Sequence, residues 1–156
     1  MAITLIELMR GTIKVLPVAY QNRLQDGLKL EAIKVTNRVG VKSRIVSATV
    51  RSSTGRGAYN CIIAFDKLQD PERDMPTMVD TPVRVRSSDP SFYFYFAYPL
   101  LKIGALYGGR LKPYEPVPDS QRQRAPGPPK NPDQLPGMSK HLWFMVEILK
   151  AEGLLK

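Results

Sequence analysis

Apolar and polar residues alternate through the middle of the chain, and this pattern predicts β-strands. The stretch RIVSATVRS at 44–52 alternates and is rich in Val, Ile and Thr, and a second run, AYNCIIAFDK, occupies 58–67. The Gly-containing sequence STGRG at 53–57 separates the two runs, so we expect a hairpin. Val alternates with Arg at 82–88, which predicts a third strand. Together the runs predict a small antiparallel sheet from about residue 44 to residue 88.

Helical spacing marks the N-terminal part of the chain. The stretch ITLIELMR at 3–10 predicts one helical segment, and AYQNRLQDGLK at 19–29 predicts another beyond Pro17. The first segment is apolar enough to pack either in the protein's own core or on a partner, and both interpretations stay open. We therefore divide the chain into an N-terminal helical docking segment, 1–35, and an α+β domain, 36–156.

A further helix is predicted at the C-terminal end, from residue 139 to about residue 152. Ser139 is a favourable N-cap residue, and Gly153 is a stop signal. The apolar stripe of this helix consists of Leu142, Met145, Val146 and Leu149. Because such a stripe packs on the apolar face of a sheet, the predicted fold class is α+β, a small antiparallel sheet with a packed C-terminal helix.

A long proline-rich excursion precedes this helix. Residues 110–137 contain eight of the 14 prolines, together with Arg122, Arg124 and Lys130. A segment of this composition forms neither a helix nor a central strand, and it is too long for a simple loop in a compact domain. We expect it either to be mobile or to lie along another subunit.

Six aromatic residues fall within seven positions from Phe92 to Tyr98. Such a run could stack nucleic-acid bases, but that function needs nearby cations for the phosphates, and no Lys or Arg occurs between Arg86 and Lys102. The run is therefore predicted to lie in the core or in a subunit interface.

Composition sets limits on the class of protein. The chain has 156 residues, of which 43% are hydrophobic, so we expect one domain with extensions. It has no run of about 18 apolar residues, so we expect no membrane span and a protein that is intracellular or assembled inside a cell.

Positive charge is concentrated in the first part of the chain. The net charge is +9, and residues 1–60 hold ten Lys and Arg against three Asp and Glu. From residue 34 to residue 56 there is no acidic residue, and the basic residues are Lys34, Arg38, Lys42, Arg44, Arg51 and Arg56. This basic block predicts binding to nucleic acid or to an acidic neighbouring subunit, and a solvated strand face is the third alternative.

Cysteine and histidine each occur once. With Cys61 alone, neither an intramolecular disulfide nor a Cys-rich zinc site can form, and we interpret Cys61 as a buried structural thiol. His141 lies in the first turn of the C-terminal helix, where the helix dipole favours neutral imidazole. Asp89 and His141 could form a general-base pair, but a structural histidine accounts for the same residues. The chain has no Gly-rich phosphate loop or ligand-spaced cluster, so we predict a protein without catalytic activity.

A set of short motifs falls in a recognisable order between about residues 82 and 150. A strand leads into the turn Ser87-Ser88-Asp89-Pro90-Ser91-Phe92, and Asn131-Pro132 follows within the proline-rich excursion. The helix then opens with Pro136-Gly137-Met138-Ser139-Lys140-His141-Leu142. This order resembles the SWIM-type zinc-finger-like modules of structural proteins in tailed bacteriophages, in which the turn reads Cys-x-Cys-Pro-x-Phe and the helix opens with Cys-x-His.

The resemblance implies a degenerate metal site. Ser87, Asp89 and Ser139 stand where the relatives have thiolates, and only His141 remains as a ligand. Because a structural zinc site needs about four N or S donors, we predict no zinc and no other cofactor. We expect hydrogen bonds to keep the local frame instead, with Ser87, Asp89 or Ser139 capping backbone amides and bonding His141.

The resemblance also implies a function. It predicts a non-enzymatic structural component of a virion, assembled in the host cytoplasm and located in the tail, baseplate, neck or head. The expected partners are other virion proteins, copies of the same chain in a symmetric particle, and nucleic acid, but no membrane. The alternative from the residues alone is a nucleic-acid-binding protein that uses the basic block at 34–56.

Overall fold

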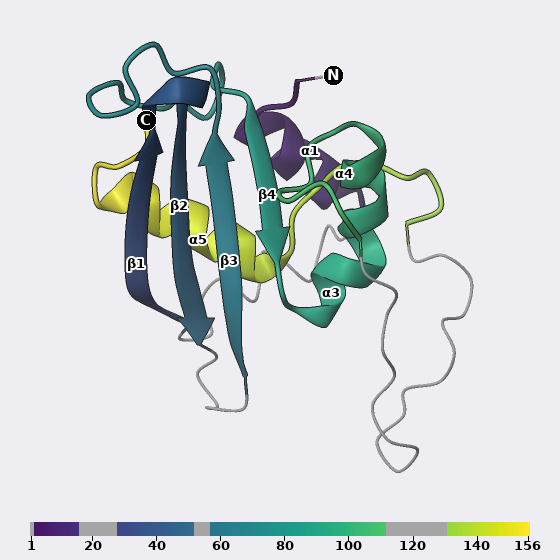
Figure 1. The fold of residues 1–156 in the computed structure, drawn as a ribbon. Coiled ribbons are helices and arrows are strands. Elements are labelled where there is room, and N and C mark those ends of the chain that lie inside the picture. Colours follow the sequence, from purple (N-terminus) through teal and green to yellow (C-terminus); the bar gives the residue numbers. More distant parts are fainter. Residues whose placement is uncertain (1, 16–27, 52–56, 112–130) are drawn as a thin grey trace.

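The computed structural model describes residues 2–15, 28–51, 57–111 and 131–156 (Figure 1). One antiparallel sheet has the strand order β1-β2-β3-β4, with β1 at Lys29–Arg38, β2 at Ser43–Arg51, β3 at Ala58–Phe65 and β4 at Val83–Ser87. The helices are α1 at Leu5–Val15, α3 at Pro90–Phe92, α4 at Tyr98–Lys102 and α5 at Lys140–Ala151, with a 3-10 turn η1 at Val39–Val41 and a π-helical turn η2 at Tyr93–Ala97. The predicted α+β fold class is thereby confirmed.

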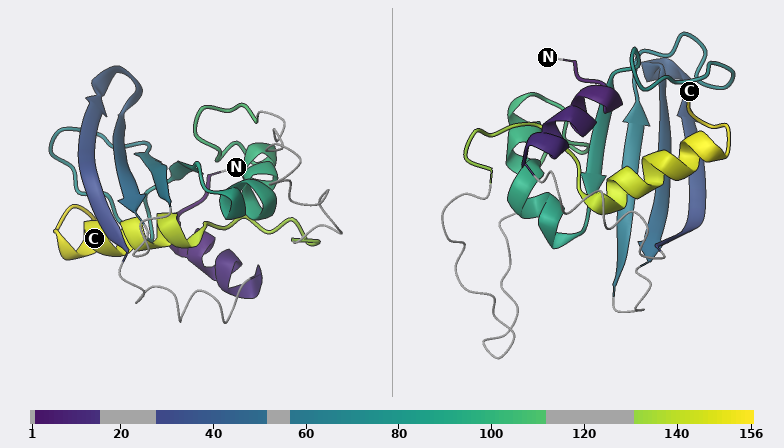
Figure 2. Two further views of the ribbon diagram at one scale, coloured as in Figure 1. Left: turned by 90° about the horizontal axis from the view of Figure 1, so that it is seen from below. Right: turned by 180° about the vertical axis from the view of Figure 1, so that it is seen from behind.

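The register of the three predicted strands gives the sheet one apolar face. β2 pairs with β3 so that Val46 lies opposite Ile63, and β3 pairs with β4 so that Ile63 lies opposite Val85. Alternate residues share a face, and those of this face are buried in one core with the apolar stripe of α5. Figure 2 shows α5 and α1 on this side of the sheet. The strands predicted at 44–52, 58–67 and 82–88 are confirmed within about two residues, whereas most of the turn predicted at 53–57 lies outside the described residues.

Strand β1 was not predicted, and the sheet begins at Lys29 rather than near residue 44. Nine of its ten residues are exposed and only Leu30 is half-buried, so the strand lacks the alternation that marks its neighbours. It is held instead by a ladder to β2, interrupted by a bulge where Ala32 has a φ of 53°. The helix predicted at 19–29 falls largely outside the described residues, but its last position belongs to β1. The domain boundary expected at 35/36 lies within the same strand.

Helix α1 begins at a capping box. The amide of Thr4 donates to Oε1 of Glu7 at 3.2 Å, and the amide of Glu7 donates to Oγ1 of Thr4 at 3.4 Å. The helix continues beyond the predicted range of 3–10, to Val15. Its buried residues are Leu5, Leu8, Met9 and Thr12. Of the two interpretations of this apolar segment, these buried residues support packing in the protein's own core.

The aromatic run forms one continuous helical segment, α3-η2-α4. Asp89 caps it and Pro90 occupies its first turn, where a missing amide proton costs no hydrogen bond. Phe92 and Phe96 are buried in the core, one of the two locations predicted for this run, and Leu100 beyond the run is buried with them, while Tyr98 is 54% exposed.

Helix α5 begins and ends as the sequence predicts. Ser139 has the extended backbone of an N-cap, with φ −71° and ψ 167°. Gly153 has a φ of 75°, and the amides of Gly153 and Leu154 donate to the carbonyls of Lys150 and Leu149 in a Schellman arrangement. Within the described ranges, no helix has both the length and the apolar character needed to cross a membrane.

Candidate functional site

The four residues predicted to mark the degenerate metal site lie together. Ser87 ends β4, Asp89 opens the following turn, and Ser139 and His141 stand at the N-terminus of α5. Oδ2 of Asp89 lies 2.5 Å from Oγ of Ser87, 2.6 Å from Oγ of Ser139 and 3.2 Å from Nδ1 of His141. All four are buried, between 0% and 6% exposed. We call these four residues the Asp89 cluster.

The second carboxylate oxygen of Asp89 caps the aromatic helix. Oδ1 accepts a 2.7 Å hydrogen bond from the amide of Phe92, as expected for a capping residue. Ser139 does not cap its own helix through its side chain, contrary to one of the roles we expected for it. Its hydroxyl donates to the carboxylate of Asp89, a charge-assisted hydrogen bond in the buried interior.

Electrostatics within the cluster favour an ionised Asp89. Burial by itself would raise the pKa of the Asp89 carboxyl, but contacts with His141, Ser139, Ser87 and the Phe92 amide outweigh it, and the pKa lies below its ordinary value. Nδ1 of His141 lies 3.2 Å from Oδ2 of Asp89 but makes no well-aligned hydrogen bond. The ring of Tyr59 meets the His141 ring edge-on at a centroid distance of 4.7 Å.

Cys61 adjoins the Asp89 cluster, a relationship that we did not predict. It lies opposite Ser87 in the β3-β4 ladder, and its Sγ is 3.5 Å from Oγ of Ser87. Burial raises the pKa of the Cys61 thiol to about 12, partly offset by the bond to Ser87 and reinforced by the charge of Asp89. A thiol with this pKa is protonated and inert, which agrees with a structural thiol. No local sequence signal locates it, because the β3–β4 register that places Cys61 opposite Ser87 is set by the fold.

The chemistry of the cluster is that of a buried structural network. Both Ser hydroxyls donate to Asp89, so neither is aligned to give its proton to His141. The Asp89–His141 pair is buried, at 2% and 6% side-chain exposure, and is not set out for contact with a substrate. Within the described part of the chain, no three His, Cys, Asp or Glu side chains are grouped closely enough to hold a metal ion.

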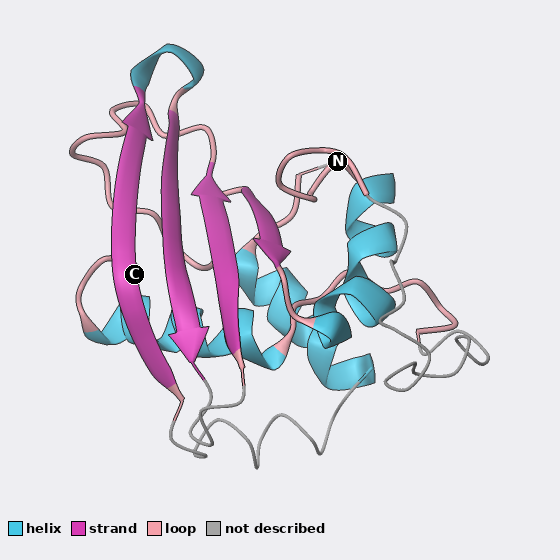
Figure 3. Cartoon of the chain, turned by 60° about the horizontal axis from the view of Figure 1, so that its bottom comes forward, coloured by secondary structure: helices cyan, strands magenta, loops and turns pink. Residues whose placement is uncertain are grey.

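A second candidate site lies on the opposite face of the sheet. Helices α1 and α5 pack behind the strands, and α3 and α4 lie beside β4, which leaves most of the other face uncovered in the described structure (Figure 3). Alternation along the strands places on this open face the basic residues Lys29, Lys34, Arg38, Arg51, Arg84 and Arg86, with the acidic residues Glu31 and Asp66. We call it the open face.

The basic block of the sequence is divided between the two faces. Lys34, Arg38 and Arg51 belong to the open face, and Lys42 stands at its rim. Arg44 pairs with Phe65 and so lies on the other face, where its Nε donates to the carbonyl of Pro71 at 2.8 Å. Arg44 therefore does not share the open face with Lys34, Arg38 and Arg51, because one residue of register reverses a side chain's direction. Arg56 lies outside the described residues.

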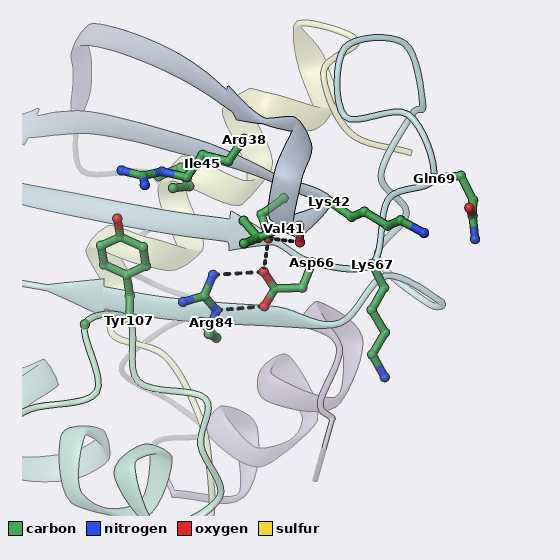
Figure 4. Close-up of a pocket in the computed structure, with 11 residues that line it drawn as sticks. Arg38, Val41, Lys42, Ile45, Asp66, Lys67, Gln69, Arg84 and Tyr107 are labelled. Carbon is green, nitrogen blue, oxygen red and sulfur yellow. Dashed lines mark hydrogen bonds and ion pairs between the residues drawn. The ribbon is translucent and has the colours of Figure 1, made fainter.

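A pocket of about 750 Å³ opens at one end of the open face (Figure 4). Its lining includes Arg38, Lys42, Lys67, Arg84, Asp66 and Tyr107. Arg84 makes a bidentate ion pair with Asp66, at 2.8 Å and 2.9 Å, and Ser43 donates to the same carboxylate at 2.6 Å. We call this cavity the open-face pocket. Lys67 and Arg84 line it, but they lie outside the basic block and were not predicted as site residues.

The wall of the open-face pocket is fixed by arginines of β4. Arg86 donates to the carbonyls of Tyr107 and Arg110, at 2.7 Å each. The Arg84 guanidinium lies 5.5 Å from the centroid of the Tyr107 ring. These contacts hold the segment that follows α4 against the sheet, so the pocket is preformed.

Comparison with known proteins gives no relative: no protein-family model, no curated protein and no solved structure matches the chain. A functional assignment therefore depends on the residues themselves and on their geometry.

Proposed function

We propose that this protein is a non-enzymatic structural component of a tailed-bacteriophage particle, which acts by docking on neighbouring subunits. The observation that carries the proposal is the Asp89 cluster. The resemblance expects the turn at 87–89 and the helix opening at 139–141 to meet at one point, and they meet at Oδ2 of Asp89 across 50 residues of sequence. A carboxylate and two hydroxyls stand where the modules that the chain resembles have three thiolates, which supports a retained frame with a different chemistry.

The Asp89 cluster has a structural role in the fold. It fastens the N-terminus of α5 to the end of β4, and α5 carries the apolar stripe that covers the sheet. The same frame holds both ends of the proline-rich excursion. Arg86 binds the carbonyl of Arg110 on one side, and the Asn131 amide donates to the carbonyls of Tyr95 and Leu135, at 2.8 Å each, on the other. The intervening residues 112–130 lie outside the described residues, and docking through them remains part of the proposal.

The polar groups of the described structure fit a docking function better than a catalytic one. The hydroxyls of the Asp89 cluster are bonded to a carboxylate, and the Cys61 thiol is protonated. The open face, in contrast, presents a broad charged surface suited to contact with a large partner. We place the protein in a virion assembled in the host cytoplasm, with other virion proteins or further copies of this chain as neighbours.

Mass spectrometry of purified particles tests the proposal. Virions of the phage that encodes this chain would be banded on a density gradient, and heads and tails would be separated before digestion. We expect peptides of the chain at a fixed ratio to the major structural protein in one of these fractions. A chain that is made during infection but stays in the soluble lysate would overturn the assignment.

A further inference from the structure

We propose that the open-face pocket and the cations beside it bind the phosphate backbone of nucleic acid. The inference names a partner for the docking protein proposed above and rests on that function only for its setting in a particle. The surface consists of Arg38, Lys42 and Lys67 around the pocket and Lys34 along β1, and we call it the phosphate track.

Unpaired charge is the first argument. Asp66 is the acidic residue that lines the pocket, and Arg84 and Ser43 occupy its carboxylate oxygens. Within the described residues, no ion pair involves Arg38, Lys42 or Lys67. These three cations therefore face solvent with their charge uncompensated, and release of counterions from a bound polyanion would favour association.

The shape of the charged surface is the second argument. Lys34 and Arg38 lie on the same face of β1, opposite Ser47 and Ser43 of β2. Four residues of extended strand span about 13 Å, so positive charge continues from the pocket along the strand. A single phosphate would occupy only the pocket, whereas a nucleic-acid strand, with one charge about every 3.4 Å, matches the whole track.

The surroundings of the track favour nucleic acid over an acidic protein. Beside its cations the open face presents the hydroxyl groups of Thr36 and Ser47, which alternation places on this side, and the apolar side chain of Ile45 among them is almost fully buried. Interfaces between proteins have apolar, charge-depleted centres, while interfaces with nucleic acid are more polar and much more positive. Because these side chains reach phosphates rather than base edges, binding should not depend on base sequence.

Fluorescence anisotropy with the full chain tests the inference. The probes are a labelled 30-nucleotide single strand of mixed sequence, its duplex, and a second pair of unrelated sequence. With about four phosphate contacts, affinity for the duplex should fall about 100-fold between 50 mM and 200 mM salt. The triple variant Arg38→Gln, Lys42→Gln, Lys67→Gln should bind at least about tenfold more weakly at 50 mM salt and lose most of the salt dependence.

A charge-matched control separates this surface from net charge. The variant Lys14→Gln, Lys150→Gln, Lys156→Gln removes three exposed cations, from α1, α5 and the end of the chain, which lie off the open face. It should bind like the unchanged protein, and thermal melting of both variants verifies that they fold. Equal losses in the two variants would overturn the inference, as would an absence of binding to any of the nucleic acids.

A competitor identifies the class of ligand. Polyglutamate of matched total charge should displace the oligonucleotide only at much higher concentration, and equal displacement would assign the track to acidic protein instead. Failure here leaves the particle assignment standing if the chain is found in virions. Conversely, if the chain binds nucleic acid but is absent from virions, the phosphate track is supported and the particle assignment fails.

Discussion

The hydroxyl of Ser139 donates a 2.6 Å hydrogen bond to Oδ2 of Asp89, joining the first residue before α5 to the turn that follows β4. Both side chains are buried, at 0% and 2% exposure, so the bond forms away from water. A bond to a charged acceptor in such surroundings is worth more than one between neutral groups at the surface. Asp89 is therefore the residue on which the joint between sheet and helix most depends.

Replacing the Asp89 carboxylate should destabilise the whole domain. Asp89→Asn removes the charge that Ser87, Ser139 and His141 face, and it leaves buried donors without their acceptor. We expect the free energy of unfolding to fall by about 3 kcal/mol, measured by guanidinium denaturation. The matched control Asp80→Asn, on an exposed turn, should change it by less than about 0.5 kcal/mol. Similar effects of the two substitutions would contradict a special role for Asp89.

The same carboxylate should make stability depend on pH in the acid range. Its pKa in the folded protein is depressed, so the unfolded chain takes up a proton first as the pH falls. The contribution of Asp89 is fully present above its ordinary pKa of about 4 and is lost as the pH falls further, through the folded-state pKa. The stability difference between the unchanged protein and Asp89→Asn should therefore shrink from pH 7 toward pH 2.

Urea denaturation of both proteins at each pH measures this difference. The other carboxyl groups titrate in both proteins, so their contributions cancel in the difference of unfolding free energies. The groups near Asp89, His141 and the Cys61 thiol, are present in both proteins. A difference that stays constant down to pH 2 would show that the carboxylate is not stabilised as the geometry indicates.

The thiol of Cys61 should resist modification until the protein unfolds. With a pKa of about 12, its thiolate fraction at pH 8 is about 10³-fold below that of a free cysteine. Labelling with Ellman's reagent should therefore be slow in buffer and complete within seconds in 6 M guanidinium, because unfolding exposes the thiol. Rapid labelling of the native protein would place Cys61 in an accessible, activated environment and reopen the question of a nucleophile.

The strands at the centre of the sheet could be predicted because each has one buried face. Buried apolar residues recur at every second position, as Val46, Ala48 and Val50 do in β2, and the alternation is visible without a structure. Strand β1 shows no such pattern, since its side chains are almost all exposed and the pairing with β2 alone keeps it extended. An edge strand of this kind is set by tertiary contacts that no local pattern records.

The two candidate sites differ in how far the sequence anticipates them. The resemblance named all four members of the Asp89 cluster, and the turn and the helix opening that carry them also leave signals in the sequence. The open-face pocket combines Arg38 with Lys67 and Arg84 from later segments, and only the strand register brings them together. Charge counting along the chain also included Arg44, which the register turns to the other face.

Replacing Gly11 should destabilise the protein, although glycine is normally unfavourable within a helix. Alanine is the better helix former by about 1 kcal/mol, but a Cβ at this position would overlap the carbonyl oxygen of Pro136, where the returning chain crosses α1. We expect Gly11→Ala to destabilise the protein by about 1–3 kcal/mol in thermal or chemical unfolding. Gly40→Ala is the control, because nothing lies within 4 Å of its added methyl group and it should be neutral or slightly stabilising. A stabilising Gly11→Ala would mean that α1 and the segment before α5 do not touch.

The strongest test of the retained frame is to restore the ligands that the resemblance implies. Two hydroxyl donors and Nδ1 of His141 lie 2.5–3.2 Å from Oδ2 of Asp89, so thiolates at 87, 89 and 139 would converge with His141 on one point. The variant Ser87→Cys, Asp89→Cys, Ser139→Cys should bind about one equivalent of zinc, and a chelator should lower its melting temperature, because four N and S donors make a closed structural site.

Two matched proteins make this test decisive. The unchanged protein should contain no zinc by elemental analysis and should melt at the same temperature with and without chelator, because hydroxyl groups are poor zinc ligands. The three-cysteine variant with an added His141→Ala should bind zinc more weakly, since one donor is lost. If the three-cysteine variant folds but takes up no zinc, the turn and the helix opening are not arranged as in a zinc site. The resemblance would then lose its geometric support, and the particle assignment would lose the observation that carries it.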